Sequence, residues 1–191
     1  MPYFKKLIGE KCYLSPWDIS DAEKCCKWLN DTETMVYLES FKVFSVEKER
    51  EFLENSVKKD NEKIFAVVDI KTNEPVGGCG LHGINYVNRN AEMGIFIGEK
   101  ENWGKGYGED AVNLILDFGF NVLNLNMVWL GVHNFNKRGI RCYEKCGFKH
   151  AGKFREAYFF GGEYHDTIIM DILASEFKSR YIKGVIDKVK S

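Results

Sequence analysis

The sequence predicts an α+β domain built around one mixed, mostly antiparallel sheet that is flanked by helices. Three observations support this fold class. β-Rich runs joined by short turns occupy the middle of the chain, helix-period segments lie before and after them, and a chain of 191 residues can bury enough surface to fold as one domain. The predicted order of elements is β-α-α-β-β-β-α-β-α-β-β.

The N-terminal part of the chain predicts one short strand and two helices. Residues 11–15 read as a strand that ends at a proline. Residues 18–30 carry apolar side chains at helical spacing and end in the turn-forming pair Asn-Asp. A second helix is expected over residues 45–58, with Ser45 as its N-cap.

The middle of the chain changes from helical to strand character. Residues 64–69 are β-rich, and turn residues separate them from a return strand over 75–84. A further turn precedes a third strand over 91–97. Because short turns join these three strands, they predict an antiparallel meander.

The C-terminal part alternates helices and strands and closes with a hairpin around Gly161-Gly162. Its expected elements are a helix over 108–122, a strand over 127–133, a helix over 136–145 and two strands over 148–160 and 164–173. We therefore expect one domain over residues 1–173. The lysine-rich tail, 174–191, is expected to form a helix that packs on the same domain and either covers its core or serves a homo-oligomer.

Charge and cysteine content restrict the function classes. The 27 Lys and Arg residues nearly balance the 28 Asp and Glu residues, so the chain lacks the excess of positive charge that is typical of a nucleic-acid binder. No apolar run approaches the ~20 residues that cross a bilayer, and the N-terminus does not resemble a signal peptide. The six cysteines lack the spacing of a zinc site. We expect a cytoplasmic protein with reduced thiols, without a metal, a membrane or a nucleic-acid partner.

A glycine cluster, Trp103-Gly104-Lys105-Gly106-Tyr107-Gly108, lies between the third meander strand and the long helix. Glycines at alternate positions can adopt backbone conformations that other residues cannot, and they let a ligand approach the main chain. The N–H groups of such a loop, with the positive end of a helix, predict an anion site that suits a diphosphate. The spacing fits neither the dinucleotide fingerprint nor Walker A. A plain turn into the helix is the alternative.

Two segments together resemble the GNAT acetyltransferase superfamily. Residues 101–108 look like its coenzyme A diphosphate loop, although Trp103 stands where that pattern has Gln or Arg, as is common in the branch that acetylates ribosomal-protein N-termini. Residues 136–148 are similar to its Asn–x–(Arg/Lys)–Ala–x–x–x–Tyr–Glu–x–x–Gly–Phe motif. Residues 84–92 resemble bacterial spermidine acetyltransferases. The resemblance covers roughly residues 10–173 and implies a GNAT-like fold and an acetyl-CoA-dependent N-acetyltransferase.

The resemblance also implies a set of cofactor-binding residues. The pantetheine arm would pair with the main chain of a strand segment and with Asn136, whose other reading is a helix N-cap. The diphosphate would be held mainly by main-chain groups, with Lys105 near a phosphate. The complete expected set is Ile95, Phe96, Ile97, Trp103, Gly104, Lys105, Gly106, Tyr107, Gly108 and Asn136.

Transfer of an acetyl group to an amine needs an acid and a base. Tyr143 occupies the motif position of the general acid, and a phenol with a pKa near ~10 holds its proton at neutral pH. Glu92 is the candidate base, acting through water on an amine whose pKa is near ~10.4. The alternatives are a packed, tethered tyrosine and a solvated strand-end carboxylate.

The acceptor is open at this stage among polyamines or other small amines, protein N-terminal amines and amino sugars. Aromatic residues surround the first two expected helices, where related enzymes build the acceptor pocket; they are Trp28, Tyr37, Phe41 and Phe44. Glu33 and Glu39 could attract a cationic amine, or be solvated. The alternative function is a catalytically silent GNAT-like module that senses coenzyme A or an amine.

Overall fold

Eight strands form one sheet in the part of the chain that the computed structural model describes, residues 3–38, 42–56 and 58–190. The strand order is β1-β2-β3-β4-β5-β6-β8-β7. The strands are β1 Leu7–Ile8, β2 Cys12–Ser15, β3 Lys63–Asp69, β4 Pro75–Asn85, β5 Asn90–Ile97, β6 Met127–His133, β7 Lys149–Phe160 and β8 Glu163–Leu173. Neighbouring strands are antiparallel except for β5 and β6, which are parallel.

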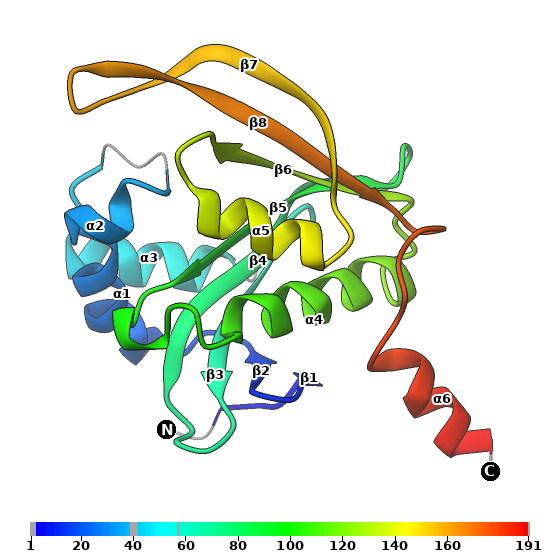
Figure 1. Cartoon of the computed structure of the whole chain (residues 1–191). Coiled ribbons are helices and arrows are strands. Elements are labelled where there is room, and N and C mark those ends of the chain that lie inside the picture. Colours follow the sequence, from blue (N-terminus) through cyan, green and yellow to red (C-terminus); the bar gives the residue numbers. More distant parts are fainter. Residues whose placement is uncertain (1–2, 39–41, 57, 191) are drawn as a thin grey trace.

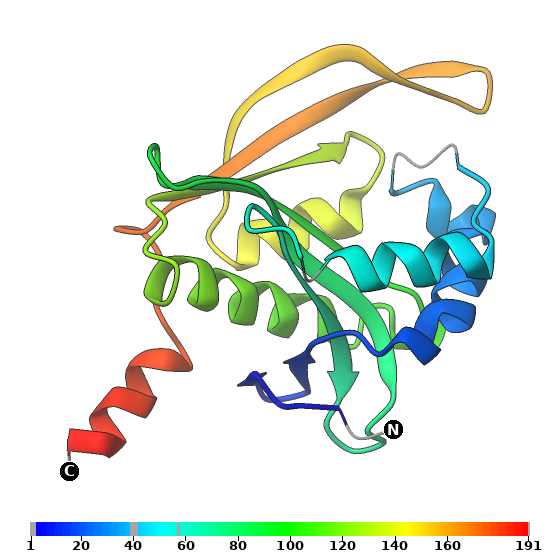
Figure 2. The same cartoon turned by 180° about the vertical axis from the view of Figure 1, so that it is seen from behind.

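The helices cover both faces of this sheet (Figures 1 and 2). Helices α4 and α5 lie on one face, and α1 and α3 lie on the other. The helices are α1 Ala22–Leu29, α2 Thr32–Met35, α3 Val46–Ser56, α4 Tyr107–Asn121, α5 Lys137–Lys145 and α6 Ile182–Lys190, with short 3₁₀ turns over Ile19–Asp21 and Lys100–Asn102. The mixed, mostly antiparallel α+β fold is the one predicted from the sequence.

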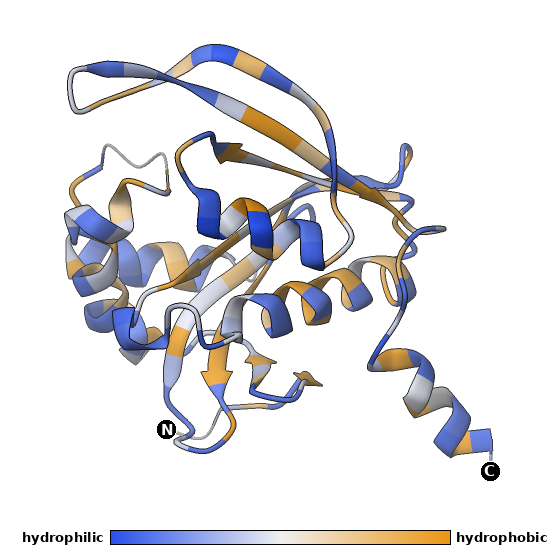
Figure 3. Cartoon of the chain, in the orientation of Figure 1, coloured by the Kyte–Doolittle hydropathy of each residue, from blue (hydrophilic) through white to orange (hydrophobic). Residues whose placement is uncertain are grey.

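The hydrophobic core lies between the sheet and α4. Eleven consecutive residues of α4, Asp110–Phe120, are buried, and they pack against buried side chains of β2 to β6. Helix α5 contrasts with α4, because only Ile140 of α5 is buried. Most of α5 is hydrophilic (Figure 3). The polar surface of α5 is therefore available to line a site, while α4 holds the sheet in place.

Most predicted elements appear with boundaries shifted by a residue or two. Two differ more: the helix expected over 174–191 is confined to α6, Ile182–Lys190, and the helix expected from residue 18 begins as the 3₁₀ turn Ile19–Asp21 before α1. The strand over 127–133 is found with its expected bounds, and Gly161 and Gly162 both have the positive φ that the hairpin turn requires. Three short elements were not predicted: β1, α2 and the 3₁₀ turn over Lys100–Asn102. Each has two to four residues, too few for a periodic pattern to show in the sequence.

Strands β5 and β6 separate along their length. They pair only at Asn90↔Met127, Ala91↔Val128 and Glu92↔Trp129, while β5 continues to Ile97. Beyond Glu92, β5 is bonded to β4 on one side, and no strand of the described residues pairs with its other edge. This edge faces the region where α4 and α5 begin (Figure 1).

Among the residues of the described ranges, no helix has the length and apolar character to cross a membrane. Helix α6 is joined to the body through Asp117 of α4, which accepts hydrogen bonds from the Ser179 hydroxyl and from the main-chain N–H groups of residues 180–182.

Candidate functional site

The N-terminus of α4 is open to a ligand. Its N-cap is Gly106, whose φ of 91° is closed to most side chains and which supplies no capping side chain. The first helical hydrogen bond runs from Asp110 N to Gly106 O at 3.1 Å. The three N–H groups before it, from Tyr107 to Glu109, therefore have no acceptor within the helix. These donors and the helix dipole favour an anion.

The free edge of β5 supplies further main-chain groups. Gly98 N donates to Val76 O at 2.9 Å, which places the main chain of alternate β5 residues toward β4. Ile97 O instead accepts a 2.7 Å hydrogen bond from Trp103 Nε1, on the side away from β4. Because ladder bonds alternate, Ile95 shares this outward orientation, whereas the main chain of Phe96 faces β4.

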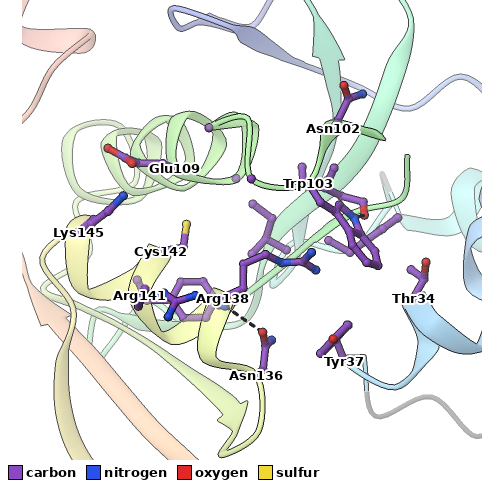
Figure 4. A pocket seen from close by; sticks show the side chains of 18 of the residues that line it. Thr34, Tyr37, Asn102, Trp103, Glu109, Asn136, Arg138, Arg141, Cys142 and Lys145 are labelled. Carbon is purple, nitrogen blue, oxygen red and sulfur yellow. Dashed lines mark hydrogen bonds between the residues drawn. The ribbon is translucent and has the colours of Figure 1, made fainter. Parts of the chain in front are cut away.

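Helix α5 begins next to this edge. Asn136 is its N-cap, and Asn136 Oδ1 accepts from Gly139 N at 2.9 Å, so the predicted capping role is confirmed. A Cβ at Gly139 would lie 2.7 Å from the Asn136 amide, so a side chain at this position would crowd the cap. Asn136 Nδ2 remains as a donor toward the cavity that the residue lines (Figure 4).

Tyr143, two turns further along α5, contacts Phe148 edge-on at 5.9 Å between ring centroids. Burial raises the pKa of the Tyr143 phenol, and the nearby Cys142 and Cys146 thiols add to the effect. Within the described residues its hydroxyl makes no hydrogen bond, so the phenol is not tethered as a structural tyrosine would be. It is a protonated donor at neutral pH.

These elements enclose a cavity of about 340 Å³, here called the α4–α5 cavity. It contains most of the predicted site: Ile95, Phe96, Ile97, Trp103, Gly104, Gly106, Gly108, Asn136 and Tyr143 all line it. The strand, the glycine loop and α5, which are separate in the sequence, thus meet at one place.

Three predicted site residues do not line this cavity. Lys105 is exposed on the glycine loop. The Tyr107 hydroxyl bonds to Asp69, and this bond raises the pKa of Tyr107 to about 12, so only the main chain of Tyr107 is turned to the site. Glu92 is exposed on β5, in register with His82 and Trp129.

Sequence reasoning missed a basic face and a buried hydroxyl in the α4–α5 cavity. Arg138, Arg141 and Lys145 line it from α5 at a spacing of three and four residues, a pattern that is readable in the sequence (Figure 4). Arg138 lies over the Trp103 ring at 3.9 Å, held by a cation–π contact. The Thr34 hydroxyl, from α2, is buried, has no hydrogen-bond partner among the described residues and also lines the cavity.

The residues expected near the acceptor do not lie together in the structure. Tyr37 lines the α4–α5 cavity, 6.2 Å from Trp103 between ring centroids. Trp28 contacts Phe96 edge-on at 6.0 Å, and Phe44 lines a second cavity between α1, α3 and the sheet. Glu33 forms an ion pair with Lys100 at 2.7 Å. Glu39 and Phe41 lie outside the described residues.

Comparison with known proteins identifies the class. The chain matches the acetyltransferase (GNAT) domain family over residues 11–149. It is similar to spermidine N(1)-acetyltransferase of Vibrio cholerae, with 38% identity over 133 residues that span 69% of this chain and 76% of that protein. It is also similar to a putative ribosomal N-acetyltransferase of Bacillus subtilis, with 32% identity over 102 residues, 53% of this chain and 55% of that protein.

Solved structures agree with this. The crystal structure of spermidine N-acetyltransferase from Vibrio cholerae in complex with CoA and spermine has a TM-score of 0.80 and 30% identity, and the match covers 87% of this chain and 97% of that one. The chain therefore belongs to the acetyltransferase (GNAT) domain family. It is an N-acetyltransferase, and it is related to both branches that the sequence motifs indicated, the ribosomal-protein and the spermidine acetyltransferases.

Proposed function

We propose that the protein transfers an acetyl group from acetyl-CoA directly to a primary amine, with Tyr143 as the general acid. The observation that carries this proposal is that the uncapped start of α4 and the unbonded Tyr143 hydroxyl belong to one cavity. The acceptor is a polyamine or another small amine, or a protein N-terminal amine. Polyamine and ribosomal-protein acceptors appear in the names of the relatives.

The residues of the α4–α5 cavity fit coenzyme A. Gly104 and Gly106 have φ values of 74° and 91°, and they place main-chain donors where a side chain would strain the loop. The diphosphate is assigned to these donors, with Lys105 on the exposed side of the loop. Arg138, Arg141 and Lys145 add positive charge for the phosphates. The outward main-chain groups of Ile95 and Ile97, with Asn136, are assigned to the pantetheine arm.

Acetyl-CoA, when bound, supplies the activated acetyl thioester. Tyr143 holds its proton on Oη and donates a hydrogen bond toward the leaving sulfur. Full proton transfer from a phenol to a thiolate whose acid has a pKa near ~8.5 is uphill. As the bond from the acceptor nitrogen to the acetyl carbon forms and the C–S bond breaks, Tyr143 gives its proton to the sulfur and takes up the proton that the nitrogen releases, so that no phenolate persists.

Glu92 is proposed as the base, acting through water. Its side chain lies on the face of β5 that also carries Gly94 and Phe96, because side chains alternate along a strand. Its register partner His82 lines the second cavity, as do Gly94 and Phe96. Glu92 is solvent-exposed, which suits proton transfer to water more than direct contact with the amine.

A thiol-release assay tests the proposal. The protein is incubated with acetyl-CoA and a panel of spermidine, small monoamines and N-terminal peptides. Release of free thiol that depends on one acceptor, and acetylation of that acceptor by mass spectrometry, supports the proposal. Binding of acetyl-CoA without thiol release from any amine would instead favour a sensor of coenzyme A or amines.

We further propose that residues 1–173 form the acetyltransferase domain and that 174–191 pack on it. The hydrogen bonds from Ser179 and from the main chain of residues 180–182 to Asp117 support this arrangement. A cytoplasmic, reducing location is proposed as well, and the six unpaired cysteines are compatible with it.

A further inference from the structure

A second cavity of about 870 Å³ lies between α1, α3 and the sheet, and we call it the α1–α3 cavity. It shares Leu38, Ile95 and Phe96 with the α4–α5 cavity, so the two meet at the β5 segment assigned to pantetheine. Its walls are mainly apolar and include the rings of Trp17, Phe44, Phe52 and Phe96. A cavity of this size and composition suits a bulky apolar group.

One carboxylate belongs to this wall. Glu49, in the first turn of α3, is only 5% exposed and lines the cavity. Within the described chain, no hydrogen bond or ion pair reaches its side chain, and burial raises the pKa of the carboxyl. A buried carboxylate without a partner is costly for a folded protein, so its presence points to a ligand that supplies a cation or a donor.

The other charged groups at the cavity favour a ligand with one positive charge over a ligand with several. Lys48 lines it from α3, Lys42 from the segment before α3, and His82 from β4. Of the described lining residues, Glu49 is the one acid, so a ligand with several positive charges would meet two ammonium groups and one carboxylate. A single ammonium matches this arrangement better than a polycation.

We propose that the α1–α3 cavity is the acceptor site and that it selects a monoamine with a bulky apolar, aromatic body, such as an arylalkylamine. Glu49 forms an ion pair with the ammonium, and the apolar walls enclose the ring. The amine then lies near the segment shared by both cavities. This inference rests on the proposed function and narrows its acceptor class.

Calorimetric binding of 2-phenylethylamine, ethylamine and spermidine, with and without coenzyme A, tests the inference separately from turnover. We expect 2-phenylethylamine to bind more than about tenfold more tightly than ethylamine, because its ring leaves water. Glu49→Gln should weaken 2-phenylethylamine binding roughly 10- to 100-fold, the usual effect of a charged hydrogen bond. Glu51→Gln, which removes the same charge from an exposed position of α3, is the matched control and should leave binding unchanged.

Three results would overturn the inference: equal binding of the two monoamines, tighter binding of spermidine than of 2-phenylethylamine, or unchanged binding in Glu49→Gln. Thermal unfolding of each variant shows that it is folded. If amine binding depends on Glu49 as expected but no thiol is released from acetyl-CoA, the proposed transferase function fails, while the assignment of the α1–α3 cavity as an aromatic-amine site stands.

Discussion

The Tyr181 hydroxyl donates a 2.6 Å hydrogen bond to Asp110 Oδ1, which joins the C-terminal tail to the first turn of α4. The same carboxylate accepts from the main-chain N–H groups of Glu10, Lys11 and Cys12. Asp110 follows directly on the uncapped N–H groups proposed to hold the diphosphate. The turn between β1 and β2 and the C-terminal tail are therefore joined at one buried side chain, next to the candidate site.

Replacing Asp110 by Asn should destabilise the protein by at least about 2 kcal/mol at neutral pH, because charged hydrogen bonds are lost. Burial raises the pKa of Asp110, but the hydrogen bonds from Tyr181 and the β1–β2 turn outweigh it and hold the pKa below its ordinary value. A depressed pKa in the folded state stabilises the fold above the unfolded pKa of ~3.9 and loses this effect as the pH falls. Urea unfolding of both proteins should therefore differ most at pH 7 and converge below about pH 4.

Tyr181→Phe is a milder change, because it removes only one of the five groups that donate hydrogen bonds to Asp110. We expect a loss of about 1–2 kcal/mol in urea unfolding. An unchanged unfolding free energy would contradict the role of the tail as a fastening element.

Gly106→Val should raise the KM for acetyl-CoA by roughly tenfold or more, because a β-branched residue at a φ of 91° costs about 1–3 kcal/mol and distorts the start of α4. Gly152→Val is the control, since a side chain there meets no atom within 4 Å. Steady-state kinetics with the acceptor held constant measure the effect. An unchanged KM would remove the loop from the cofactor site.

Tyr143→Phe should lower kcat by roughly 10²- to 10⁴-fold while leaving the affinity for coenzyme A nearly unchanged, since only the hydroxyl is lost. Tyr164→Phe, at an exposed position, should leave kcat as it is. Retention of full activity by Tyr143→Phe would show that the phenol is structural.

Arg138→Gln should weaken coenzyme A binding about tenfold at low salt, and the difference should shrink as ionic strength rises. The matched variant Arg155→Gln removes an arginine from β7, away from the residues that line the α4–α5 cavity. Titration calorimetry at two salt concentrations distinguishes them. A salt-independent loss would point to packing of Arg138 on Trp103 instead of phosphate binding.

Glu49→Gln should stabilise the protein although it is expected to impair acceptor binding. The folded-state pKa of Glu49 is raised by burial, so at neutral pH the charged carboxylate disfavours the folded state. Removal of that charge should raise the midpoint of thermal unfolding by a few degrees, where roughly 2–4 °C corresponds to about 1 kcal/mol at this chain length. A lower midpoint would indicate that Glu49 has a structural partner.

Long periodic segments and positions with special backbone requirements could be predicted from the sequence. The strand over 127–133, the N-cap at Asn136 and the positive φ at Gly161 and Gly162 depend on neighbouring residues, so local reasoning reached them. The meander and the long buried helix followed for the same reason. Helix α2, with four residues, has no periodicity of its own and is set by its surroundings.

By itself, the sequence determined the order of elements, the two motifs and the acetyltransferase class, because these depend on residue type and spacing along the chain. Only the tertiary structure decided which groups face one space. It placed Tyr143 beside the start of α4, turned the side chain of Tyr107 away to Asp69, and left Glu49 without a partner among the described residues, in an apolar wall. Such relations depend on where β5 and β6 separate and on how α1 and α3 cover the sheet. These are properties of packing between distant segments, which spacing along the chain does not encode.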